Sequence, residues 1–576
     1  MIKRLLSSPY LLILLLGTVL FLPMLGYVHL FDWDEINFAE SAREMLLTGD
    51  YTRVTINFQP FWEKPPLFIW MQALSMKVLG VNELAARLPN ALCGIATLMV
   101  LFHYGRKYRD TSFGWFWVLA YAGSWLPQLY FKSGIIDPVF NLFMFLGVIH
   151  LAQWAKAKLT NLHYRHVTLA ALFIGLAVLT KGPVGLLLPG LAVTIWIVVR
   201  RRWFLQLMPL LVSALVFLAV TFAWYGAETL RNGWWFLGEF LQYNLRLAQT
   251  EDSGHGGPFF YHWGVLLLGC FPASILMFYQ PKTTPAPTEN QSPALLDLRT
   301  WMWILLGVVL VVFSIVQTKI VHYSSLAYFP ITFLAACTLY RWQDITLKVP
   351  RAMVISLALS IGAFGGLLIG GTYFMSTERG WAVIAGLISQ TAFTDVVKPW
   401  PFYYIFIGLL FTIWAGTGMW TMWKGQLLTG AIRIFIITAV AVQLMYILVL
   451  PNIEPLTQGV MVAFLKEQAK EDVYINVLGF KSYAHLYYGE KQPDDINTSA
   501  FNNALIAHKA RLGLQNLSPS EFNDFERWWH VEGDIDKPVV FVVRAIKSAQ
   551  IENENPQLKR IGEGGGYVFL KREPLK

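Results

Sequence analysis

Residues 11–25 read LLILLLGTVLFLPML, and residues 32–40, a few positions further on, read DWDEINFAE. The first stretch is the centre of a candidate membrane span, and the second places several carboxylates directly beyond it. The apolar character extends along the chain: of 576 residues, 55% are hydrophobic and 14% are charged, and the mean hydropathy is +0.48. One globular core cannot bury this much apolar surface. The sequence indicates an integral membrane protein and excludes a soluble enzyme, a disordered scaffold and a fibrous protein.

Thirteen segments are candidates for membrane-spanning helices, each of which needs about 20 mainly apolar residues. The first resembles a signal peptide because Lys3 and Arg4 precede it, but no small-residue cleavage site follows, so we expect it to be retained. The expected spans are 9–30, 84–104, 112–131, 135–154, 165–181, 183–199, 204–225, 258–279, 300–317, 321–340, 353–374, 402–423 and 431–451.

Lys and Arg concentrate on alternate connections between these spans, as the positive-inside rule describes for cytoplasmic loops. The basic connections lie on the cytoplasmic side if the N-terminus is cytoplasmic. An odd number of spans then places the tail, residues 452–576, on the outer side. This topology accounts for the net charge of +9, so the charge does not indicate a nucleic-acid partner.

The tail is long enough for a small domain. Short apolar runs at 473–477 and 539–543 predict buried strands. A helical stretch around 501–512 and a turn at 563–567 before a last strand complete an α/β pattern. The tail shows no catalytic signature.

The predicted fold class is therefore an α-helical polytopic membrane protein with a small C-terminal extracytoplasmic α/β domain. The predicted domains are a transmembrane catalytic domain over 1–451, with long outer loops at 31–83 and 226–257, and a soluble domain over 452–576. Function on loops over a rigid scaffold is common, so we expect the chemistry in the outer loops.

The first outer loop opens with a cluster of acids and continues as a predicted helix. Phe38, Ala42 and Met45 fall on one apolar face, which is typical of a helix in the membrane interface that ends near Gly49. Asp34 has two interpretations. It caps or complements the first turn of this helix, or it belongs to a carboxylate cluster that serves as a general base or a metal site.

Several cations and one more acid lie at the outer ends of other predicted spans. Asp137 precedes a proline, so it is either a helix cap or an acid that lines a polar cavity. Each lysine taken singly is explained as a surface ion pair or as a side chain that extends to the membrane surface. Together they form an outward-facing set suited to an anionic headgroup, made up of Lys64, Lys181, Arg246 and Lys319.

His255 lies between two glycines in the second long outer loop, next to Glu251 and Asp252. A histidine beside acids is able to ligate a divalent ion. A single histidine is weak support for a metal site, so a structural role remains the alternative.

Six motifs, in order over roughly residues 30–330, resemble those of bacterial GT-C glycosyltransferases of the protein O-mannosyltransferase and ArnT-like (aminoarabinose transferase) superfamily. The first is Asp34-Glu35 with Ala39-Glu40 and Ala42-Arg43-Glu44-Met45. The others are Glu63-Lys64-Pro65-Pro66-Leu67, Ala86-Arg87-Leu88-Pro89, Leu179-Thr180-Lys181-Gly182-Pro183, Gly254-His255-Gly256-Gly257-Pro258 and Thr318-Lys319-Ile320-Val321-His322-Tyr323. The tail is similar to ArnT-like architecture as well, although no motif there matches.

The resemblance implies a GT-C fold and an inverting transfer from a polyprenyl-phosphate-linked sugar, with no firm cofactor and a divalent metal ion as an open alternative. Asp34 would be the catalytic carboxylate and Asp137 a second essential acid. Glu35 and Lys181 would support the site, and Glu63 and His255 are the candidates for a metal contact. The donor phosphate would be held by Lys64, Arg246, Lys319, His322 and Tyr323.

One position departs from the family pattern. ArnT-like sequences tend to have Arg three residues after the first-loop Asp, where this chain has Asn37. One phosphate contact is therefore missing or is supplied by Arg246, Lys319 or His322.

Three classes of function compete. We expect a glycosyltransferase of a bacterial cytoplasmic (inner) membrane that acts on its outer face. Its expected partners are a polyprenyl-phosphate-linked sugar as donor, a lipid A-type lipid or a protein hydroxyl as acceptor, and membrane lipids. A transporter or flippase for lipid-linked sugar is the alternative, but it predicts charges near the bilayer midplane and paired half-repeats. A structural protein predicts no cluster of titratable groups in the outer loops. The acid-rich outer loops favour the enzyme.

Overall fold

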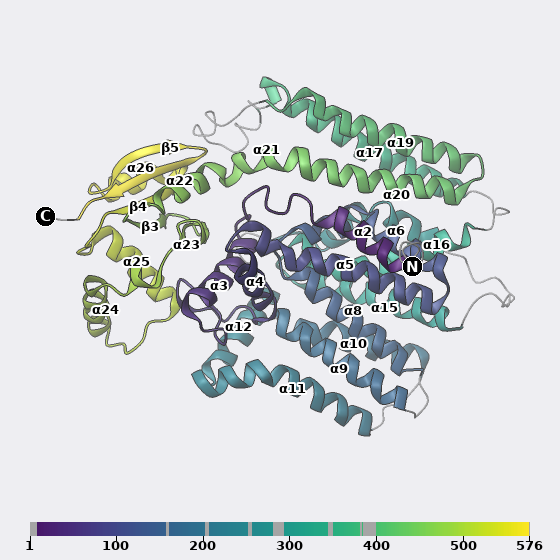
Figure 1. The fold of residues 1–576 in the computed structure, drawn as a ribbon, viewed down its shortest axis with the longest axis horizontal. Coiled ribbons are helices and arrows are strands. Elements are labelled where there is room, and N and C mark those ends of the chain that lie inside the picture. Colours follow the sequence, from purple (N-terminus) through teal and green to yellow (C-terminus); the bar gives the residue numbers. More distant parts are fainter. Residues whose placement is uncertain are drawn as a thin grey trace.

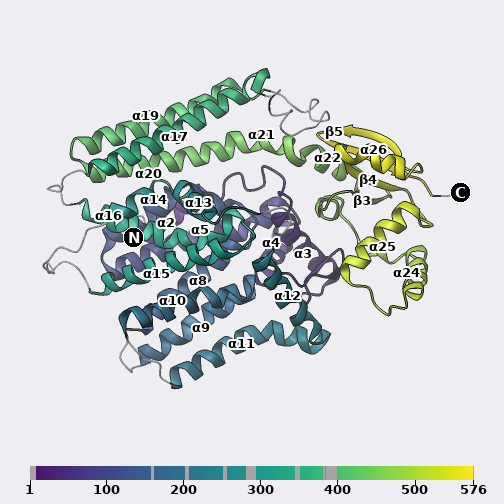
Figure 2. The ribbon, with the colours of Figure 1, turned by 180° about the vertical axis from the view of Figure 1, so that it is seen from behind.

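The computed structural model describes residues 8–156, 161–201, 207–250, 256–279, 293–343, 350–380, 383 and 399–574. Figure 1 shows a large helical body with a sheet-bearing C-terminal domain at one end. Figure 2 shows the same order from behind, with the start of α2 (Pro9–Phe21) toward the far end of the body. We call the end of the body that faces the C-terminal domain the domain end. Here lie α3 (Asp34–Thr48), α4 (Leu67–Leu79) and α12 (Trp235–Gln249).

Within the described residues, seven helices are long and apolar enough to cross a membrane, or eight if one bent pair is a single span. The chain is therefore a multi-span membrane protein, and the count of thirteen spans stays a prediction. The seven are Glu83–Tyr108, Tyr164–Lys181, Leu207–Arg231, Ala294–Ile315, Arg351–Met375, Phe402–Trp423 and Leu427–Gln468. Shorter apolar helices are Pro9–Phe21, Leu67–Leu79 and Val184–Arg200.

The helical body is built from the following elements. They are α5 (Glu83–Tyr108), α6 (Thr111–Ala122), α7 (Trp125–Leu129), η1 (Tyr130–Lys132), α8 (Asp137–Trp154), α9 (Asn161–Lys181), α10 (Val184–Arg200), α11 (Leu207–Asn232), α13 (Tyr261–Gly269), α14 (Ala273–Leu276), η2 (Met277–Tyr279), α15 (Pro293–Ile315), η3 (Val321–Ala327), α16 (Tyr328–Arg341), α17 (Arg351–Met375), η5 (Phe402–Tyr404), α19 (Ile405–Trp423) and α20 (Leu427–Leu444).

Three segments that the sequence predicts as single spans are interrupted. The segment 112–131 is divided into α6, α7 and η1, and 321–340 begins as the 3₁₀ helix η3 before α16. The segment 258–279 bends by 106° between α13 and α14. Pro272 stands at this bend, and because proline lacks an N–H and clashes with the preceding turn, it ends α13.

The last membrane helix continues without a break into the C-terminal domain, so the predicted boundary at 451 falls inside a helix. Between α20 and α22 (Val460–Gln468), the chain forms two π-helical turns, η6 (Met445–Val449) and η7 (Pro455–Gly459), around α21 (Leu450–Glu454). These wider turns accommodate prolines that an unbroken α-helix excludes. The sequence predicts that the last span ends at 451.

The C-terminal domain contains a four-stranded sheet in the order β3-β4-β6-β5, with β3 parallel to β4 and the other neighbours antiparallel. The expected strands, helix and final turn are confirmed. The strands are β3 (Tyr474–Leu478), β4 (Val539–Arg544), β5 (Lys559–Gly564) and β6 (Tyr567–Arg572). The helical elements are α23 (Ala484–Tyr487), η8 (Pro493–Ile496), α24 (Ser499–Leu512), α25 (Pro519–Glu532) and α26 (Ala545–Glu554).

The core of this domain forms where β4, buried from Val539 to Val543, packs with the aromatic side chains of α24 and α25. A short hairpin of the first loop, β1 (Thr55–Ile56) and β2 (Gln59–Pro60), joins this core through Phe58. Its two turn residues, Asn57 and Phe58, have φ of 57° and 54°, which is the backbone of a two-residue type I′ hairpin turn. The first loop and the C-terminal domain therefore share one core.

Helix α3 begins and ends as predicted, with Gly49 at φ 70° terminating it. The predicted apolar face, with Phe38, Ala42 and Met45, is buried, and the polar face of the helix is buried as well. Arg43 binds Glu40 through two hydrogen bonds of 2.7 Å and also donates to the backbone carbonyls of Leu486 and Lys491. The hydrophobic periodicity of the helix does not predict these contacts with the C-terminal domain.

Glu44 on this buried face makes stability depend on pH. Burial, together with the nearby Glu40, raises its pKa to about 8, whereas an unfolded glutamate titrates near 4.5. The unfolded state therefore loses this proton at a lower pH than the folded state, and stability falls as pH rises from about 4.5 to about 8. We expect Glu44→Gln to raise the Tm by at least about 2 °C at pH 8 and by less at pH 5.

Thermal unfolding of the purified protein in detergent at the two pH values measures this difference. Glu467→Gln, an exposed carboxylate on α22, is the matched control and should leave the Tm unchanged at both. An equal effect of Glu44→Gln at pH 5 and pH 8 would contradict the assignment.

Candidate active site

A cavity of about 420 Å³ lies at the domain end of the helical body. We call it the central cavity. Its walls come from α3, the turn before α4, α8, α9, α12, η3 and the segment between β3 and α23. It is lined by Asp32, Trp33, Asp34, Asn37, Phe38, Glu63, Lys64, Ile136, Asp137, Lys181, Tyr243, Thr318, Ile320, His322, Tyr323 and Lys481.

Asp34 presents its carboxylate to this cavity. The residue is the first of α3 and the N-cap position is taken by Trp33, so Asp34 is not a cap but an acid of the first turn, where it complements the helix dipole and also lines the cavity. Its side chain is 35% exposed, and its Oδ2 lies 3.5 Å from Nε2 of His322. A carboxylate held this loosely is able to accept a hydrogen bond from an incoming group.

Asp137 is held much more tightly. It begins α8, its side chain is 4% exposed, and its Oδ1 accepts a hydrogen bond of 2.6 Å from Lys181 Nζ. Its other oxygen lies 3.6 Å from His322 Nε2, so His322 stands between the two acids. Lys181 also lies 4.7 Å above the ring of Tyr323. Asp137 therefore fixes a lysine and a histidine, and Asp34 is the more accessible acid.

Lys64 supplies a second cation to the cavity. Its Nζ lies 4.9 Å from the centre of the Tyr243 ring. Burial lowers the pKa of Lys64, and the charge of Lys181 lowers it further, whereas Glu63, Asp34 and Asp137 act in the opposite direction. Two cations held close together in a partly buried site favour an anion with more than one negative oxygen.

Glu35 points away from Asp34 and forms a buried ion pair with Arg87 of α5. The guanidinium donates to both carboxylate oxygens, at 2.9 and 2.7 Å. Phe31 and Gly134 donate backbone N–H groups to the same carboxylate. Burial alone would raise the pKa of Glu35, but these partners bring it below its usual value. Glu35 thus supports the site by fastening the start of α3.

Two predicted site residues of the described part of the chain, Lys319 and Arg246, do not line the cavity. Lys319 Nζ donates to the carbonyls of Phe313 and Ser314, both at 2.8 Å, and to that of Val316, so it caps the end of α15 rather than facing an anion. Arg246 is exposed on α12, with its guanidinium 5.4 Å from the Tyr243 ring. His255 lies outside the described residues.

Of the two proposed metal contacts, Glu63 lines the cavity. Within the described ranges, no group of three or more His, Cys, Asp and Glu side chains is placed to hold a metal ion. A metal at this site therefore stays a prediction.

Sequence reasoning missed two lining residues and gave another no positive role. Tyr243 belongs to a helix that was treated as a loop, and Lys481 comes from the tail, where no motif indicated function. Lys481 Nζ lies 4.0 Å above the Trp33 ring. Asn37 was noted only as a departure from a pattern, but it is buried and lines the cavity, and its Oδ1 has no hydrogen-bond partner in the described structure.

A second, largely apolar cavity of about 480 Å³ adjoins the first. The two share Asp32, Trp33, Asp34 and His322. Much of its remaining wall comes from the π-helical region of the last span, including Met445, Val449, Leu450 and Ile453. A charged site is thus continuous with a space suited to a hydrocarbon chain.

Comparison with known proteins gives matches at three levels. The family model described as dolichyl-phosphate-mannose-protein mannosyltransferase matches residues 63–225. An undecaprenyl phosphate-alpha-4-amino-4-deoxy-L-arabinose arabinosyl transferase of Shewanella sediminis is 27% identical over 314 residues, covering 53% of this chain and 55% of that protein. A protein of the same name from Enterobacter sp. is 26% identical over 334 residues, covering 57% of this chain and 59% of its own length.

The crystal structure of ArnT from Cupriavidus metallidurans bound to undecaprenyl phosphate superposes with a TM-score of 0.69 at 17% identity, covering 97% of each chain. The chain therefore has the ArnT fold over nearly its whole length. The sequence matches span somewhat more than half the length of the first curated relatives. The resemblance to bacterial GT-C transferases of the protein O-mannosyltransferase and ArnT-like type is confirmed.

The stability of the protein should depend on both partners of the Asp137–Lys181 ion pair. Removing one charge of a buried ion pair leaves the other uncompensated, so we expect Asp137→Asn to destabilise the protein by about 3 kcal/mol. The double variant Asp137→Asn/Lys181→Met should recover part of this loss because no lone charge remains. Thermal unfolding of the three proteins checks that stability falls from the parent to the double variant and then to Asp137→Asn. A double variant less stable than Asp137→Asn would show that the pair is not the cause.

Proposed function

We propose that this chain, with the fold of ArnT and an acid–cation cavity at its domain end, is a membrane glycosyltransferase that uses a polyprenyl-phosphate-linked sugar. One observation carries the proposal. The accessible carboxylate of Asp34, the cations Lys64 and Lys181, and His322 line one cavity, and that cavity is continuous with an apolar one. A donor with a charged phosphate and a long hydrocarbon chain has this distribution of polarity.

In this proposal the donor phosphate occupies the central cavity near Lys64, and the hydrocarbon chain extends along the apolar cavity. Undecaprenyl phosphate is named for the curated relatives and for the solved ArnT structure, and it is the donor lipid we infer here. The Lys181 ammonium makes a cation–π contact with Tyr323, with its Nζ 4.7 Å from the centre of the ring. Lys319 and Arg246 make the other contacts described above. We therefore infer that His322 takes the place of the arginine that the family pattern has where this chain has Asn37.

The reaction is a displacement at the anomeric carbon. The acceptor O–H oxygen forms a bond to that carbon, the bond from the carbon to the phosphate oxygen breaks, and polyprenyl phosphate leaves with the electron pair. Asp34 takes or orients the acceptor proton as general base. Lys64 and Lys181 stabilise the charge that develops on the departing phosphate. Asp137 positions Lys181 and His322.

The acceptor in this proposal is an envelope molecule on the outer face of a bacterial inner membrane, with the N-terminus cytoplasmic and the C-terminal domain outside. The curated relatives carry aminoarabinose in their names. Asn37, which stands where ArnT-like sequences tend to have arginine, changes the hydrogen bonds available beside the phosphate. The sugar and the acceptor are therefore left as classes.

We expect Asp34→Asn to reduce release of free polyprenyl phosphate at least about 100-fold, as for loss of a general base. The assay uses purified protein in liposomes with a panel of undecaprenyl-phosphate sugars and cell-envelope extract as acceptor. Asp472→Asn is the matched control, since this side chain is 90% exposed in the C-terminal domain. Lys64→Ala should raise the KM for the donor and lower kcat, because Lys64 both holds the donor phosphate and stabilises the charge on the departing phosphate.

Equal release by Asp34→Asn and the parent protein would remove Asp34 from the chemistry. The flippase alternative predicts a different result in sealed vesicles: lipid-linked sugar crosses the bilayer with its phosphate–sugar bond intact.

The proposed topology gives a separate prediction. A cysteine introduced at Ala507, on the exposed surface of α24, should react with a membrane-impermeant maleimide in intact spheroplasts. A cysteine at Arg106, exposed at the end of α5, should react only after lysis. The native Cys93 and Cys270 are buried and Cys337 is partly buried, so the parent protein without an introduced cysteine is the control for background labelling. The reverse labelling pattern would invert the topology.

A further inference from the structure

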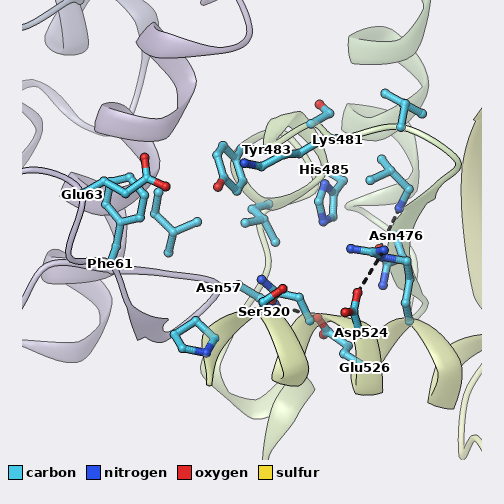
Figure 3. Close-up of a pocket in the computed structure, with 18 of the residues that line it drawn as sticks. Asn57, Phe61, Glu63, Asn476, Lys481, Tyr483, His485, Ser520, Asp524 and Glu526 are labelled. Carbon is cyan, nitrogen blue, oxygen red and sulfur yellow. Dashed lines mark hydrogen bonds and ion pairs between the residues drawn. The ribbon is translucent and has the colours of Figure 1, made fainter. Parts of the chain in front are cut away.

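A third cavity, of about 370 Å³, lies between the first loop and the C-terminal domain. We call it the interdomain cavity. Figure 3 shows Phe61 and Glu63 of the first loop on one side, facing Tyr483, Lys481 and His485 of the C-terminal domain, with Ser520, Asp524 and Glu526 of α25 below. Among its lining residues, the sequence motifs had pointed to Glu63 but to no residue of the tail.

The interdomain cavity adjoins the central cavity, because Glu63 and Lys481 line both. The apolar cavity shares residues with the central cavity but none with the interdomain cavity. The three cavities therefore follow one another in the order apolar, central and interdomain. If the donor chain extends along the first and its phosphate lies in the second, the third is the approach left for a molecule that meets the sugar.

Buried polar contacts join the first-loop wall of the interdomain cavity to the wall formed by the C-terminal domain. Asn57, at the tip of the first-loop hairpin, donates to Asn523 and Glu526 at 2.7 Å each. Lys491 donates to Asn57 and forms an ion pair with Glu526. Burial alone would raise the pKa of Glu526, but Lys491 and the other partners bring it to about 2. Residues of the first loop and of the C-terminal domain are thus joined by one buried polar network.

The lining side chains combine aromatic rings with hydrogen-bonding groups of mixed sign. Phe61, Trp62, Phe480 and Tyr483 supply rings, and Ser520 and Asn523 supply a hydroxyl and an amide. His485 is buried, and its Nδ1 has no hydrogen-bond partner in the described structure. Burial lowers the pKa of His485 to about 3, so this ring is neutral and offers a polar atom without charge.

The charges in this cavity favour a neutral ligand. Asp524 lies 3.4 Å from Arg527, and Glu526 is paired with Lys491. The described lining therefore has no surplus of cations like the Lys64 and Lys181 set of the central cavity. A phosphate group would find little to neutralise it here, whereas the apolar faces of sugar rings pack on aromatic side chains and their hydroxyls bind amides, hydroxyls and carboxylates.

A peptide acceptor is less well matched. Peptides commonly bind by pairing with the free edge of a sheet. The edge strand beside this cavity is β3, and all five of its residues are buried. Its volume of about 370 Å³ also fits a short saccharide better than a long chain.

We propose that the interdomain cavity binds the acceptor as a neutral, hydroxyl-bearing saccharide, carried on a lipid or on a free glycan, and delivers its hydroxyl past Glu63 and Lys481 to the donor sugar. This inference rests on the proposed glycosyltransferase function. It makes the C-terminal domain part of the acceptor site rather than an appendage.

The test measures saccharide binding by saturation-transfer difference NMR on the full-length protein in nanodiscs, with the neutral disaccharides maltose, cellobiose and chitobiose as probes. We expect signals from at least one of them in the parent protein. Ser520→Trp, which places an indole at the cavity wall, and Trp62→Ala, which removes a ring, should each reduce the signal at least about fivefold. Ala507→Trp, the same kind of enlargement on an exposed face of α24, should not.

Undecaprenyl phosphate is added in a parallel series, and its effect on the Tm reports on the donor site and on folding of each variant. Saccharide signals that are absent, or that survive both variants, overturn the proposal. So does a Ser/Thr peptide that gives the only signal sensitive to Ser520→Trp. Failure of the proposed function looks different: undecaprenyl phosphate then leaves the Tm of the parent protein unchanged, whatever the saccharides do.

Discussion

The buried pair of Arg87 and Glu35 fixes the segment that presents Asp34 to the site. Besides both oxygens of Glu35, the Arg87 guanidinium binds the carbonyls of Leu25, Val28 and His29. One side chain of α5 thereby holds the end of the first span, the turn after it and the first turn of α3. Breaking such a pair leaves a buried charge without compensation, which is strongly destabilising. Asp34 is adjacent in sequence to Glu35, so the accessible acid inherits its position from this contact.

The two acids of the central cavity differ because of their surroundings. Asp137 is enclosed and paired with Lys181 at 2.6 Å, whereas Asp34 is one-third exposed and only loosely approached by His322. A tightly paired carboxylate organises its neighbours, and a loosely held one is available to a substrate. The cations also differ in their surroundings. Lys64 and Lys181 face the cavity, whereas the ammonium of Lys319 donates its hydrogen bonds to three backbone carbonyls.

Much of this arrangement could be predicted from the sequence because the relevant signals are local. The apolar runs, the acids after the first span, the helix from Asp34 to Thr48 and the strands of the tail all follow from composition and periodicity. What could not be predicted depends on contacts between distant segments. Lys481 becomes a lining residue only because the tail folds back on the first loop, and Lys319 leaves the site only because α15 ends where it does. The π-helical turns around Pro451 and Pro455 also have no signature in a periodicity analysis.

The hairpin of the first loop has a consequence for biosynthesis. Asn57 is bonded to Asn523, a residue 466 positions later in the chain, and Phe58 packs into a core made from the last hundred or so residues. During synthesis the first loop emerges long before its partner exists, and contacts of such high sequence separation form slowly. The loop that bears Asp34 therefore completes its packing only when translation is finished. A chain that ends before the C-terminal domain would keep its membrane helices and its acids, but the hairpin would have no partner to pack against. The site therefore assembles only after the whole chain has been synthesised.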